Sequence, residues 1–327
     1  MTGVTVGLLG DVMLGRGVAD ALDPAHPEEV WSPQLRELVA DECDLVVCNL
    51  ECCLSVRGRR TRRIRGKPFF FRGPPAALGC LRALGVRAVG LANNHALDYE
   101  QEALADTLEL LVQAGVAVAG AGPDEESARR TAVVPAGDSA RLALVAVSDH
   151  PDEFAAGPDT PGIAWADLYD GLPAWLEREL ARARQAADLV VAFPHWGPNM
   201  SPSPAGWQRE RAADLVAGGA DLVAGHSAHV FQGVARGAGG QPILHDLGDA
   251  LDDYAIDASL RNDLGVLALW RPRGEPDVEL VGLRLRYALT EIAAGEDAEW
   301  IGRRLERACG KLGTRVERTA LARFAVR

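Results

Sequence analysis

The sequence predicts an α/β fold. Short apolar runs rich in β-branched residues alternate with longer segments of helical period. Most of these runs are uninterrupted by polar residues, which is typical of strands that are buried on both faces, as in parallel sheets. Polar side chains follow five of the runs directly. In an α/β sheet the carboxyl ends of parallel strands share one edge, where ligands bind, so the pattern predicts a site there.

Eight apolar runs are predicted to be strands, because they are short, rich in Val, Ile and Leu, and bounded by Gly, Pro or Asp. They cover residues 4–10, 44–50, 86–92, 116–120, 141–147, 188–193, 221–225 and 242–248.

Helices are predicted between these strands, over residues 100–115, 173–186 and 205–219. In the first, Leu104, Leu108 and Leu111 fall on one face, and Gly115 gives a stop signal. This spacing is the one expected for a helix that covers a sheet with its apolar side.

The period changes near the C-terminus. In "VELVGLRLRYAL" Leu283, Leu285 and Tyr287 alternate with Arg284 and Arg286, which predicts a half-exposed antiparallel strand. A closing helix over about residues 290–312 is expected to follow. We expect one domain over residues 1–327, with a core at about 4–255 that residues 256–327 complete.

Composition excludes several functional classes. The 327 residues carry a net charge of −12, which argues against a general nucleic-acid binder. No segment approaches the roughly 18 apolar residues that a membrane span needs. The N-terminal "MTGVTVGLLGDVML" lacks the features of a secretory signal, so a cytoplasmic location is expected. The six cysteines form no CxxC pair, which favours reduced, buried thiols over a disulfide framework.

The polar residues after the strands form a candidate metal site. They are Asp11 in "GD", Asn49 and Glu51 in "NLE", Asn93, Asn94 and His95 in "ANNHALD", His195 in "PHWG", and His226 and His229 in "GHSAH". Each has an ordinary explanation alone, such as a helix cap, a turn former or a packed core histidine. Together they form a ligand set that suits Mn²⁺, Zn²⁺ or Fe²⁺, and the number of donors favours two ions over one.

The motifs that contain these residues resemble those of the CapA family, the poly-γ-glutamate capsule biosynthesis proteins of the calcineurin-like metallophosphoesterase superfamily. "GDVMLGR", "NLE", "GLANNHALDY", "HWG", "GADLVAGHSAHVFQG" and, more loosely, "ILHDLGDAL" occur in the order of that family, over roughly residues 4–255. The resemblance implies a four-layer αββα sandwich, in which two mixed β-sheets are flanked by helices and the metal site lies at their shared edge.

The resemblance also implies roles for individual residues. Asp11 is similar to the first metal ligand, Glu51 takes the place of the bridging carboxylate with Asn49 as a helper, and Asn94 resembles an asparagine ligand. His195, His226 and His229 match the remaining imidazole ligands. His95 resembles the histidine that protonates a leaving group. Two divalent ions are implied as cofactors.

Two departures from the superfamily pattern concern the ligands. Met13 stands where the wider superfamily has a histidine, so one ion is held weakly or another residue supplies that ligand. "LGD" replaces the usual "LGN", so Asp249 could add a carboxylate near the site. Of the other histidines, His150 could line the cleft or be an ordinary loop residue, His245 is expected to be structural, and His26 to lie in a surface turn.

A basic insert, "VRGRRTRRIRGKP", carries seven cations between residues 57 and 67 of an otherwise acidic chain. It is either a solvated loop or a positive funnel for an anionic substrate, whether a phosphate ester or a polyglutamate carboxylate. RNA binding is the weaker alternative, and residues 69–71 are expected to form a short strand. Arg16 could hold an anion and stabilise negative charge that develops in catalysis.

Three functions remain open from the sequence. The first is a metal-dependent phosphoesterase. The second is an amide hydrolase or transferase that acts on a γ-glutamyl or related peptide bond of an anionic substrate. The third is a non-catalytic accessory protein in polymer synthesis, and the complete set of imidazoles argues against it.

Overall fold

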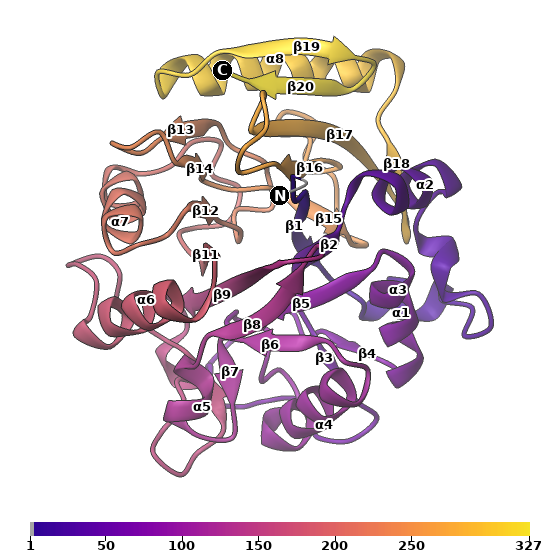
Figure 1. Cartoon of the computed structure of the whole chain (residues 1–327). Coiled ribbons are helices and arrows are strands. Elements are labelled where there is room, and N and C mark those ends of the chain that lie inside the picture. The colour runs from indigo at the N-terminus through magenta and orange to yellow at the C-terminus, as the bar shows by residue number, and fades with distance from the viewer. Residues whose placement is uncertain (1–2) are drawn as a thin grey trace.

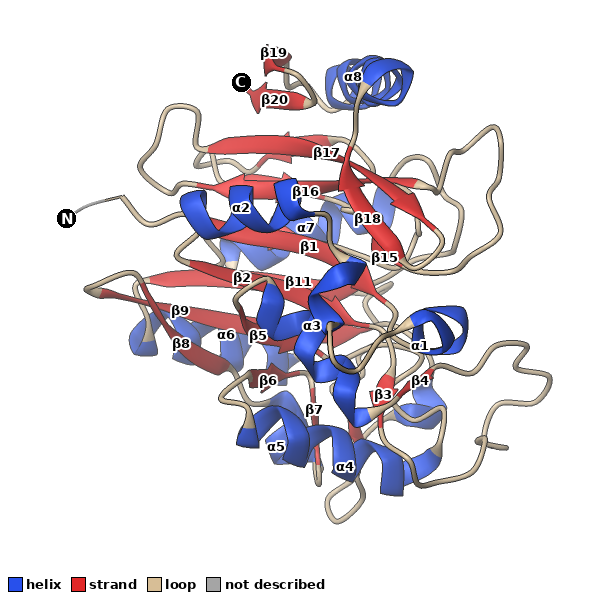
Figure 2. Cartoon of the chain, turned by 90° about the vertical axis from the view of Figure 1, so that its right-hand side faces the viewer, coloured by secondary structure: helices blue, strands red, loops and turns tan. Residues whose placement is uncertain are grey.

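Two β-sheets stack face to face in the computed structural model, which describes residues 3–327, and helices cover both outer faces (Figures 1 and 2). In Figure 1, α2 and α3 lie to the right of the strands, and α6 and α7 lie to the left. The predicted four-layer α/β sandwich is therefore confirmed.

The first sheet has ten strands and contains the N-terminal part of the chain. Its central strands β1, β2, β5 and β6 are parallel, whereas β16, β17, β20 and β19 extend it on the far side of β1 in antiparallel pairing. Across the sheet the order is β19 (Val316–Ala320), β20 (Arg323–Val326), β17 (Val278–Arg286), β16 (Leu264–Trp270), β1 (Val6–Val12), β2 (Leu45–Leu50), β5 (Val86–Gly90) and β6 (Ala117–Ala119), with β15 (Asp249–Leu251) beside β1 and β18 (Leu289–Ile292) beside β17.

The second sheet has six strands, of which the middle four are parallel. Its order is β13 (Val234–Arg236), β14 (Pro242–Leu244), β12 (Leu222–Ala224), β11 (Leu189–His195), β9 (Ala140–Ser148) and β8 (Ala132–Ala136). Two small sheets pair β3 (Cys53–Leu54) with β4 (Arg72–Gly73) and β7 (Ala121–Gly122) with β10 (Gly162–Ile163).

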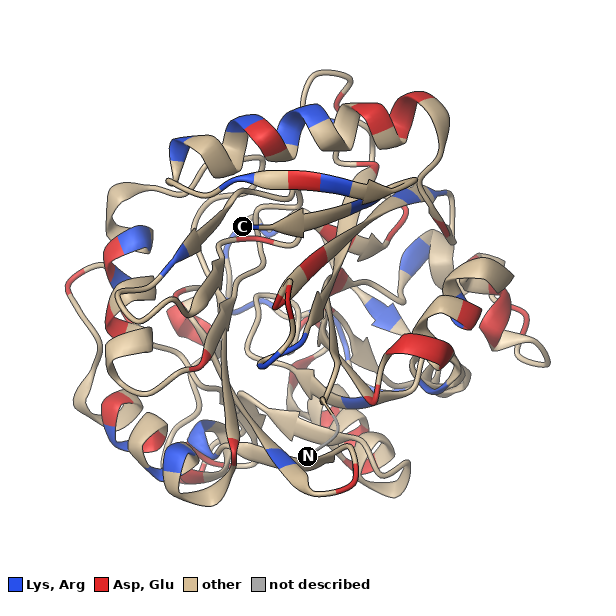
Figure 3. Ribbon diagram, turned by 45° about the horizontal axis from the view of Figure 1, so that its top comes forward, with Lys and Arg blue, Asp and Glu red and all other residues tan. Residues whose placement is uncertain are grey.

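The helices of the described chain are mostly short. They are α1 (Arg16–Ala21), α2 (Pro33–Glu42), α3 (Leu78–Ala83), α4 (Glu100–Gln113), α5 (Glu125–Arg129), α6 (Ala174–Ala186), α7 (Gly206–Ala217) and α8 (Gly295–Lys311), with short 3₁₀ helices at Pro27–Val30, Pro75–Ala77 and Asp152–Phe154. Charged residues of both signs lie mainly on the helices and loops around the sheets (Figure 3). No helix within residues 3–327 has the length and apolar character needed to cross a membrane.

Alternation along the strands creates three apolar layers. In β9, Leu142, Leu144 and Ala146 pack between the two sheets, whereas Ala143 and Val145 pack under α6 and α7. A third cluster lies between the first sheet and the helices α2, α3 and α4. Each fully buried Leu or Val side chain contributes about 1.5–3 kcal/mol to folding, so these layers account for the rigid placement of the strand ends.

The eight predicted strands and the three predicted internal helices are confirmed, with ends that shift by one to four residues. The closing helix begins only at Gly295, because residues 289–292 pair with β17 as β18. β17 itself is antiparallel as predicted, but Tyr287 lies beyond its end. The prediction that residues 256–327 complete the same domain stays a prediction, although β16 pairs directly with β1.

The predicted strand at residues 69–71 is wrong, since the pairing β4 starts only at Arg72. The backbone N–H of Phe71 donates to the carboxylate of Asp98 at 2.6 Å and not to a neighbouring strand. All six cysteines are free thiols, and burial raises the pKa of the Cys52 thiol to about 12.

Candidate metal centre

The centre forms where the carboxyl ends of both sheets meet. Asp11 lies on β1, in register with Asn49 of β2 on one side and Asp249 of β15 on the other. From the second sheet, His195 ends β11 and forms a parallel bridge with His226, which follows β12. The two sheets thus bring residues separated by up to about 240 positions to one edge, as the strand ends predicted.

Asp11, His195 and His226 make up the first group of candidate ligands. Nδ1 of His226 lies 3.5 Å and Nδ1 of His195 4.0 Å from Oδ1 of Asp11. The two Nδ1 atoms are 2.8 Å apart. Ligands that bind one ion at roughly 2.0–2.2 Å lie at most about 4.4 Å from one another, so these three atoms can share an ion.

The second group consists of Asp11, Glu51, His229 and Asp249. His229 Nδ1 lies 2.8 Å from Oδ1 of Asp249 and 3.6 Å from Oδ2 of Asp11. Its Nε2 lies 4.0 Å from Oε1 of Glu51. Asp11 is the member that both groups share, so the geometry favours Asp11 and not Glu51 as the bridging carboxylate. The reason is the position of β1, which lies between β2 and β15.

The donor atoms of the centre fit cations. Within the described part of the chain, Oε1 of Glu51 and Oδ2 of Asp249 are buried without a hydrogen-bond partner. Buried polar atoms normally have partners, because an unpaired one costs free energy. The residues present therefore suit one or two bound divalent ions, and the mixed carboxylate and imidazole set is the one expected for Mn²⁺, Zn²⁺ or Fe²⁺.

Electrostatics supports the same conclusion. Burial, together with the charge of Glu51, raises the pKa of Asp11 well above its usual range. Burial raises the pKa of Glu51 to about 7, and Asp249 adds to the shift. The pKa of His229 is raised well above its usual value although burial opposes this, because Asp249, Glu51 and Asp11 surround it. Burial and mutual repulsion therefore oppose ionisation of Asp11 and Glu51 in the metal-free chain, and a bound cation would relieve both effects.

The other two imidazoles are neutral at pH 7. Burial lowers the pKa of His226 to about 3, and burial with the neighbouring His226 lowers the pKa of His195 well below 6.5. The neutral imidazole is the form that ligates metals.

Asn94 contacts a candidate ligand. Its Oδ1 lies 3.1 Å from Nε2 of His195, the nitrogen that faces away from Asp11 and His226. This contact suits an asparagine that orients the ring, a role that commonly supports metal ligands, whereas the sequence predicted Asn94 as a direct ligand. Asn49 donates from Nδ2 to Oδ1 of Asp11 at 2.7 Å, which matches its predicted helper role.

His95 lies in a buried polar chain beside the centre. Its Nδ1 is 2.5 Å from Oδ2 of Asp98, and the other oxygen of Asp98 lies 3.2 Å from Nζ of Lys67. The ring stacks on Phe71 with centroids 3.8 Å apart. The sequence prediction missed Asp98 and Lys67. The spacing of His95 and Asp98, three residues apart in the "NNHALD" motif, was the available signal for the first, and nothing local indicated the second.

A pocket of about 320 Å³ opens beside the centre. Its lining includes His95, His229, Arg16, Phe69, Phe71 and Tyr254. The Tyr254 hydroxyl donates to Oε2 of Glu51 at 3.0 Å, so the pocket and the ligand groups are contiguous. Nε of Arg16 lies 3.3 Å from Oδ2 of Asp253. Tyr254 was not predicted, because no motif marks it.

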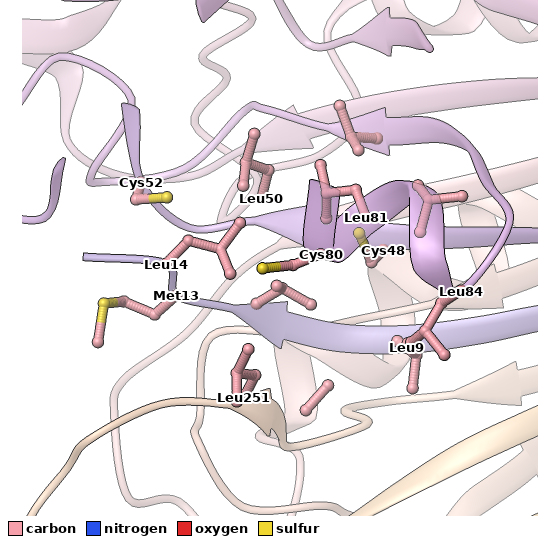
Figure 4. Packing of buried hydrophobic residues seen from close by; sticks show 14 of the residues in the cluster. Leu9, Met13, Leu14, Cys48, Leu50, Cys52, Cys80, Leu81, Leu84 and Leu251 are labelled. Carbon is pink, nitrogen blue, oxygen red and sulfur yellow. The ribbon is translucent and has the colours of Figure 1, made fainter. Parts of the chain in front are cut away.

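Met13 supplies no part of this arrangement. Its side chain is fully buried with Leu14 and Leu251 in the apolar cluster of the first sheet (Figure 4), and its sulfur accepts a hydrogen bond from the N–H of Gly15. The second group instead contains Asp249, the aspartate of the "LGD" motif that replaces the usual "LGN". Of the alternatives left open for the missing histidine, the geometry favours replacement by another residue.

The basic insert divides into anchored and exposed cations. Arg57 pairs with Asp106, Arg63 pairs with Glu100 at 3.2 Å, and the Lys67 side chain is only 7% exposed. Arg59, Arg60, Arg62 and Arg65 face solvent. The insert is thus held in part to the rest of the protein by ion pairs, and its other four arginines are exposed.

The remaining histidines lie as follows. His150 is close to the centre, with its ring centroid 5.1 Å from that of His195, but its Nδ1 faces Asp149. His245 is buried just after β14 and belongs to neither ligand group. His26 is exposed and lies beside Glu28, as a surface turn predicts.

Comparison with known proteins places the chain among capsule synthesis proteins. The family model described as "Bacterial capsule synthesis protein PGA_cap" matches residues 5–254. A probable polyglutamine synthesis accessory protein of Mycobacterium tuberculosis is 31% identical over 96% of this chain and 93% of its own length. The PGA biosynthesis protein CapA of Bacillus subtilis is 26% identical over 76% of this chain and 63% of its own length. The capsule biosynthesis protein CapA of Bacillus anthracis is 24% identical over 70% of this chain and 55% of its own length.

Proposed function

The chain belongs to the bacterial capsule synthesis protein (PGA_cap) family, and on that premise we propose that it is a metal-dependent hydrolase with a dinuclear centre. Its substrate is an anionic molecule of capsule or PGA biosynthesis, the processes named for its relatives. The observation that carries the proposal is the sharing of Asp11 by two groups of buried ligands. A structural remnant would have no reason to keep buried donors without partners.

The centre would hold its cations between the two sheets. Asp11, His195 and His226 would bind one ion, and Asp11, Glu51, His229 and Asp249 the other. When bound, two divalent ions supply positive charge that polarises a phosphoryl or carbonyl group and lowers the pKa of water. Asn49 and Asn94 keep Asp11 and His195 in orientation through their hydrogen bonds.

His95 is the residue placed to move a proton. Because Asp98 occupies its Nδ1, the proton of the neutral ring lies on that nitrogen and Nε2 is the exchangeable site. Burial lowers the pKa of His95 to about 4, although Asp98 opposes the shift, so the free ring is neutral at pH 7. His95 therefore accepts a proton before it donates one to a leaving group, as a proton relay does.

A phosphate ester and a γ-glutamyl amide both suit this chemistry. Both carry an oxygen that two cations can polarise and a leaving group that requires a proton. The second candidate function, a non-catalytic accessory protein, is kept because the Mycobacterium tuberculosis relative is named a probable accessory protein.

The test is metal analysis combined with turnover. We expect purified protein loaded with Mn²⁺ or Zn²⁺ to contain about two ions per chain and to hydrolyse either p-nitrophenyl phosphates or γ-glutamyl peptides. His95→Ala should lower kcat by about 10²-fold or more while metal content stays unchanged. His26→Ala, a change of an exposed histidine, is the matched control.

The outcomes separate the candidates. Metal binding with no turnover of either substrate would favour the accessory function. Failure to bind any divalent ion would contradict the proposal as a whole.

A further inference from the structure

The pocket beside the metal centre has a chemical character that the metal centre does not explain. His95 and His229 of the centre are among the residues that line it, so a molecule that reacts at the centre can extend into it. Its other walls include the rings of Phe69, Phe71 and Tyr254. A site for water alone needs no such walls, whereas binding pockets for organic molecules are typically apolar with a few polar groups.

Arg16 brings the positive charge to this pocket. Its guanidinium lies 5.5 Å from the ring centroid of Phe69, 5.6 Å from that of Phe71 and 5.9 Å from that of Tyr254. Within residues 3–327 its one ionic partner is Asp253, which Nε approaches at 3.3 Å, its terminal nitrogens make no hydrogen bond, and its side chain is 36% exposed. The two terminal nitrogens are therefore available to a ligand, and a guanidinium fork is suited to a carboxylate.

The backbone around the pocket is strained. Arg16, His229 and Met200 all line it, and all have positive φ angles, of 50°, 56° and 58°. Residues with a Cβ rarely adopt this region, and its cost is borne only where the surroundings enforce it. Strain of this kind concentrates at ligand sites.

We propose that this pocket is a recognition subsite for a carboxylate on the part of the substrate remote from the bond that is cleaved, with Arg16 as its anchor and Phe69, Phe71 and Tyr254 as its walls. The inference rests on the proposed function for the reacting group but concerns a different part of the substrate. The negative charge of Asp253, 3.3 Å from Nε, limits the positive potential, which favours a singly charged carboxylate over a doubly charged phosphate. Arg16 is then a binding residue and not the stabiliser of developing charge that the sequence suggested.

The experiment compares two esters that differ only in this carboxylate, 4-carboxyphenyl phosphate and phenyl phosphate, with the Mn²⁺-loaded full chain. A charge-assisted hydrogen-bonded pair is worth about 1.5–3 kcal/mol, so the wild-type protein should prefer the carboxylated ester by about 10-fold to 100-fold in kcat/KM. Arg16→Gln should abolish this preference through KM. Arg16→Lys should keep part of it, because charge remains but the fork is lost.

Arg87→Gln is the matched control, since Arg87 is an exposed arginine at the start of β5, on the opposite edge of the sheet. It should retain the full preference. No preference in the wild-type protein, or an equal fall in kcat for both esters in Arg16→Gln, would overturn the subsite.

A binding measurement without turnover tests the carboxylate subsite independently of the proposed hydrolase activity. Calorimetry with 4-carboxybenzylphosphonate and benzylphosphonate, which cannot be hydrolysed, measures the subsite without turnover. Tighter binding of the carboxylated phosphonate by the wild-type protein, lost in Arg16→Gln, would support the subsite even if no ester were cleaved. Equal affinity, or no binding of either phosphonate, would overturn it.

Discussion

The carboxylates at the two edges of the first sheet have different partners, arginines at one edge and histidines at the other. At the edge where β1 begins, Glu42 and Glu279 face Arg271 and Arg323, and Arg323 binds Glu42 at 2.5 Å and 2.8 Å. At the edge where β1 ends, the carboxylates of Asp11, Glu51 and Asp249 gather around His229, and within residues 3–327 their ion pairs are with histidines and not with lysine or arginine.

The pKa shifts record this difference. The hydrogen bond from Arg323 lowers the pKa of Glu42, and the pKa of Glu279 is lowered although burial opposes it. Burial instead raises the pKa values of Asp11 and Glu51. The first edge is a complete structural ion-pair network. The second lacks such arginine partners, and this arrangement of buried carboxylates fits the proposed site for cations.

Replacing Asp11 should have the largest effect, and it should affect only the edge where β1 ends. Asp11→Asn removes the shared ligand, so metal content should fall and kcat/KM should drop by about 10³-fold, the equivalent of roughly 4 kcal/mol of charge stabilisation. The metal-free variant should nevertheless melt at a higher temperature than the metal-free wild type, because one source of repulsion is gone. Metal analysis, kinetics and thermal melts check these outcomes. Equal metal content in the variant would contradict the assignment of Asp11.

Asp98 is an intermediate case, since this buried carboxylate near the centre does have a protein cation, Lys67. Asp98→Asn should leave metal content unchanged, because the charge of Asp98 is already matched. It should lower kcat by about 10²-fold, because His95 loses the acceptor that orients its ring and its proton. Asp106→Asn, which removes the partner of Arg57, serves as the control. A loss of metal in Asp98→Asn would show that the two regions are not independent.

Divalent cations should stabilise the folded chain through one edge only. With Mn²⁺ at about 30 times its dissociation constant, the free energy of unfolding should rise by about 2 kcal/mol. Glu42→Gln should show the same gain, and Asp11→Asn should show little of it. Urea unfolding with and without metal measures the effect. No gain in the wild-type protein would argue against a preformed cation site.

The smallest effect is expected at the ion-pair edge. Glu42→Gln should lower the free energy of unfolding by about 1 kcal/mol at pH 7.5, since the network is partly exposed. The folded pKa of Glu42 is depressed, so its contribution is present above the unfolded value of 4.5 and is lost as pH falls through the lower folded value. The difference between variant and wild type should therefore shrink at pH 4. A difference that grows at low pH would reverse the assigned sign.

Glu51 has the opposite dependence in the metal-free chain. Its folded pKa of about 7 is raised, so its contribution is present below the unfolded value and is lost as pH rises through 7. The free energy of unfolding of the metal-free wild-type protein should fall as pH rises through 7. The difference between wild type and Glu42→Gln, measured in the same pH series, should shrink as pH falls toward 4.

Much of the candidate site could be predicted because its residues stand in fixed relation to strand ends. Asp11, His195 and His226 each follow or end a run of buried residues, and the direction of a parallel strand decides at which edge they emerge. The C-terminal half of the first sheet was less accessible. β16 is a continuous apolar strand like the others, but only pairing with β1 shows that it extends the sheet in antiparallel sense.

Two of the residues that were missed share a feature. Lys67 and Tyr254 act through contacts with residues 27 to 203 positions away in the chain. No local pattern of hydrophobicity or turn chemistry encodes such contacts. The same holds for Asn94, whose place beside Nε2 of His195 depends on how the two sheets are stacked.

The sequence by itself determined the α/β class, the strands and the set of imidazoles and carboxylates at one edge, because alternation and strand direction are local properties of the chain. Only the tertiary structure decided that Asp11 is the shared carboxylate, that Asp249 joins it while Met13 is buried in the core, and that Arg16 faces an aromatic pocket. Those outcomes depend on register between strands and on the packing of one sheet against the other, which many distant residues set together.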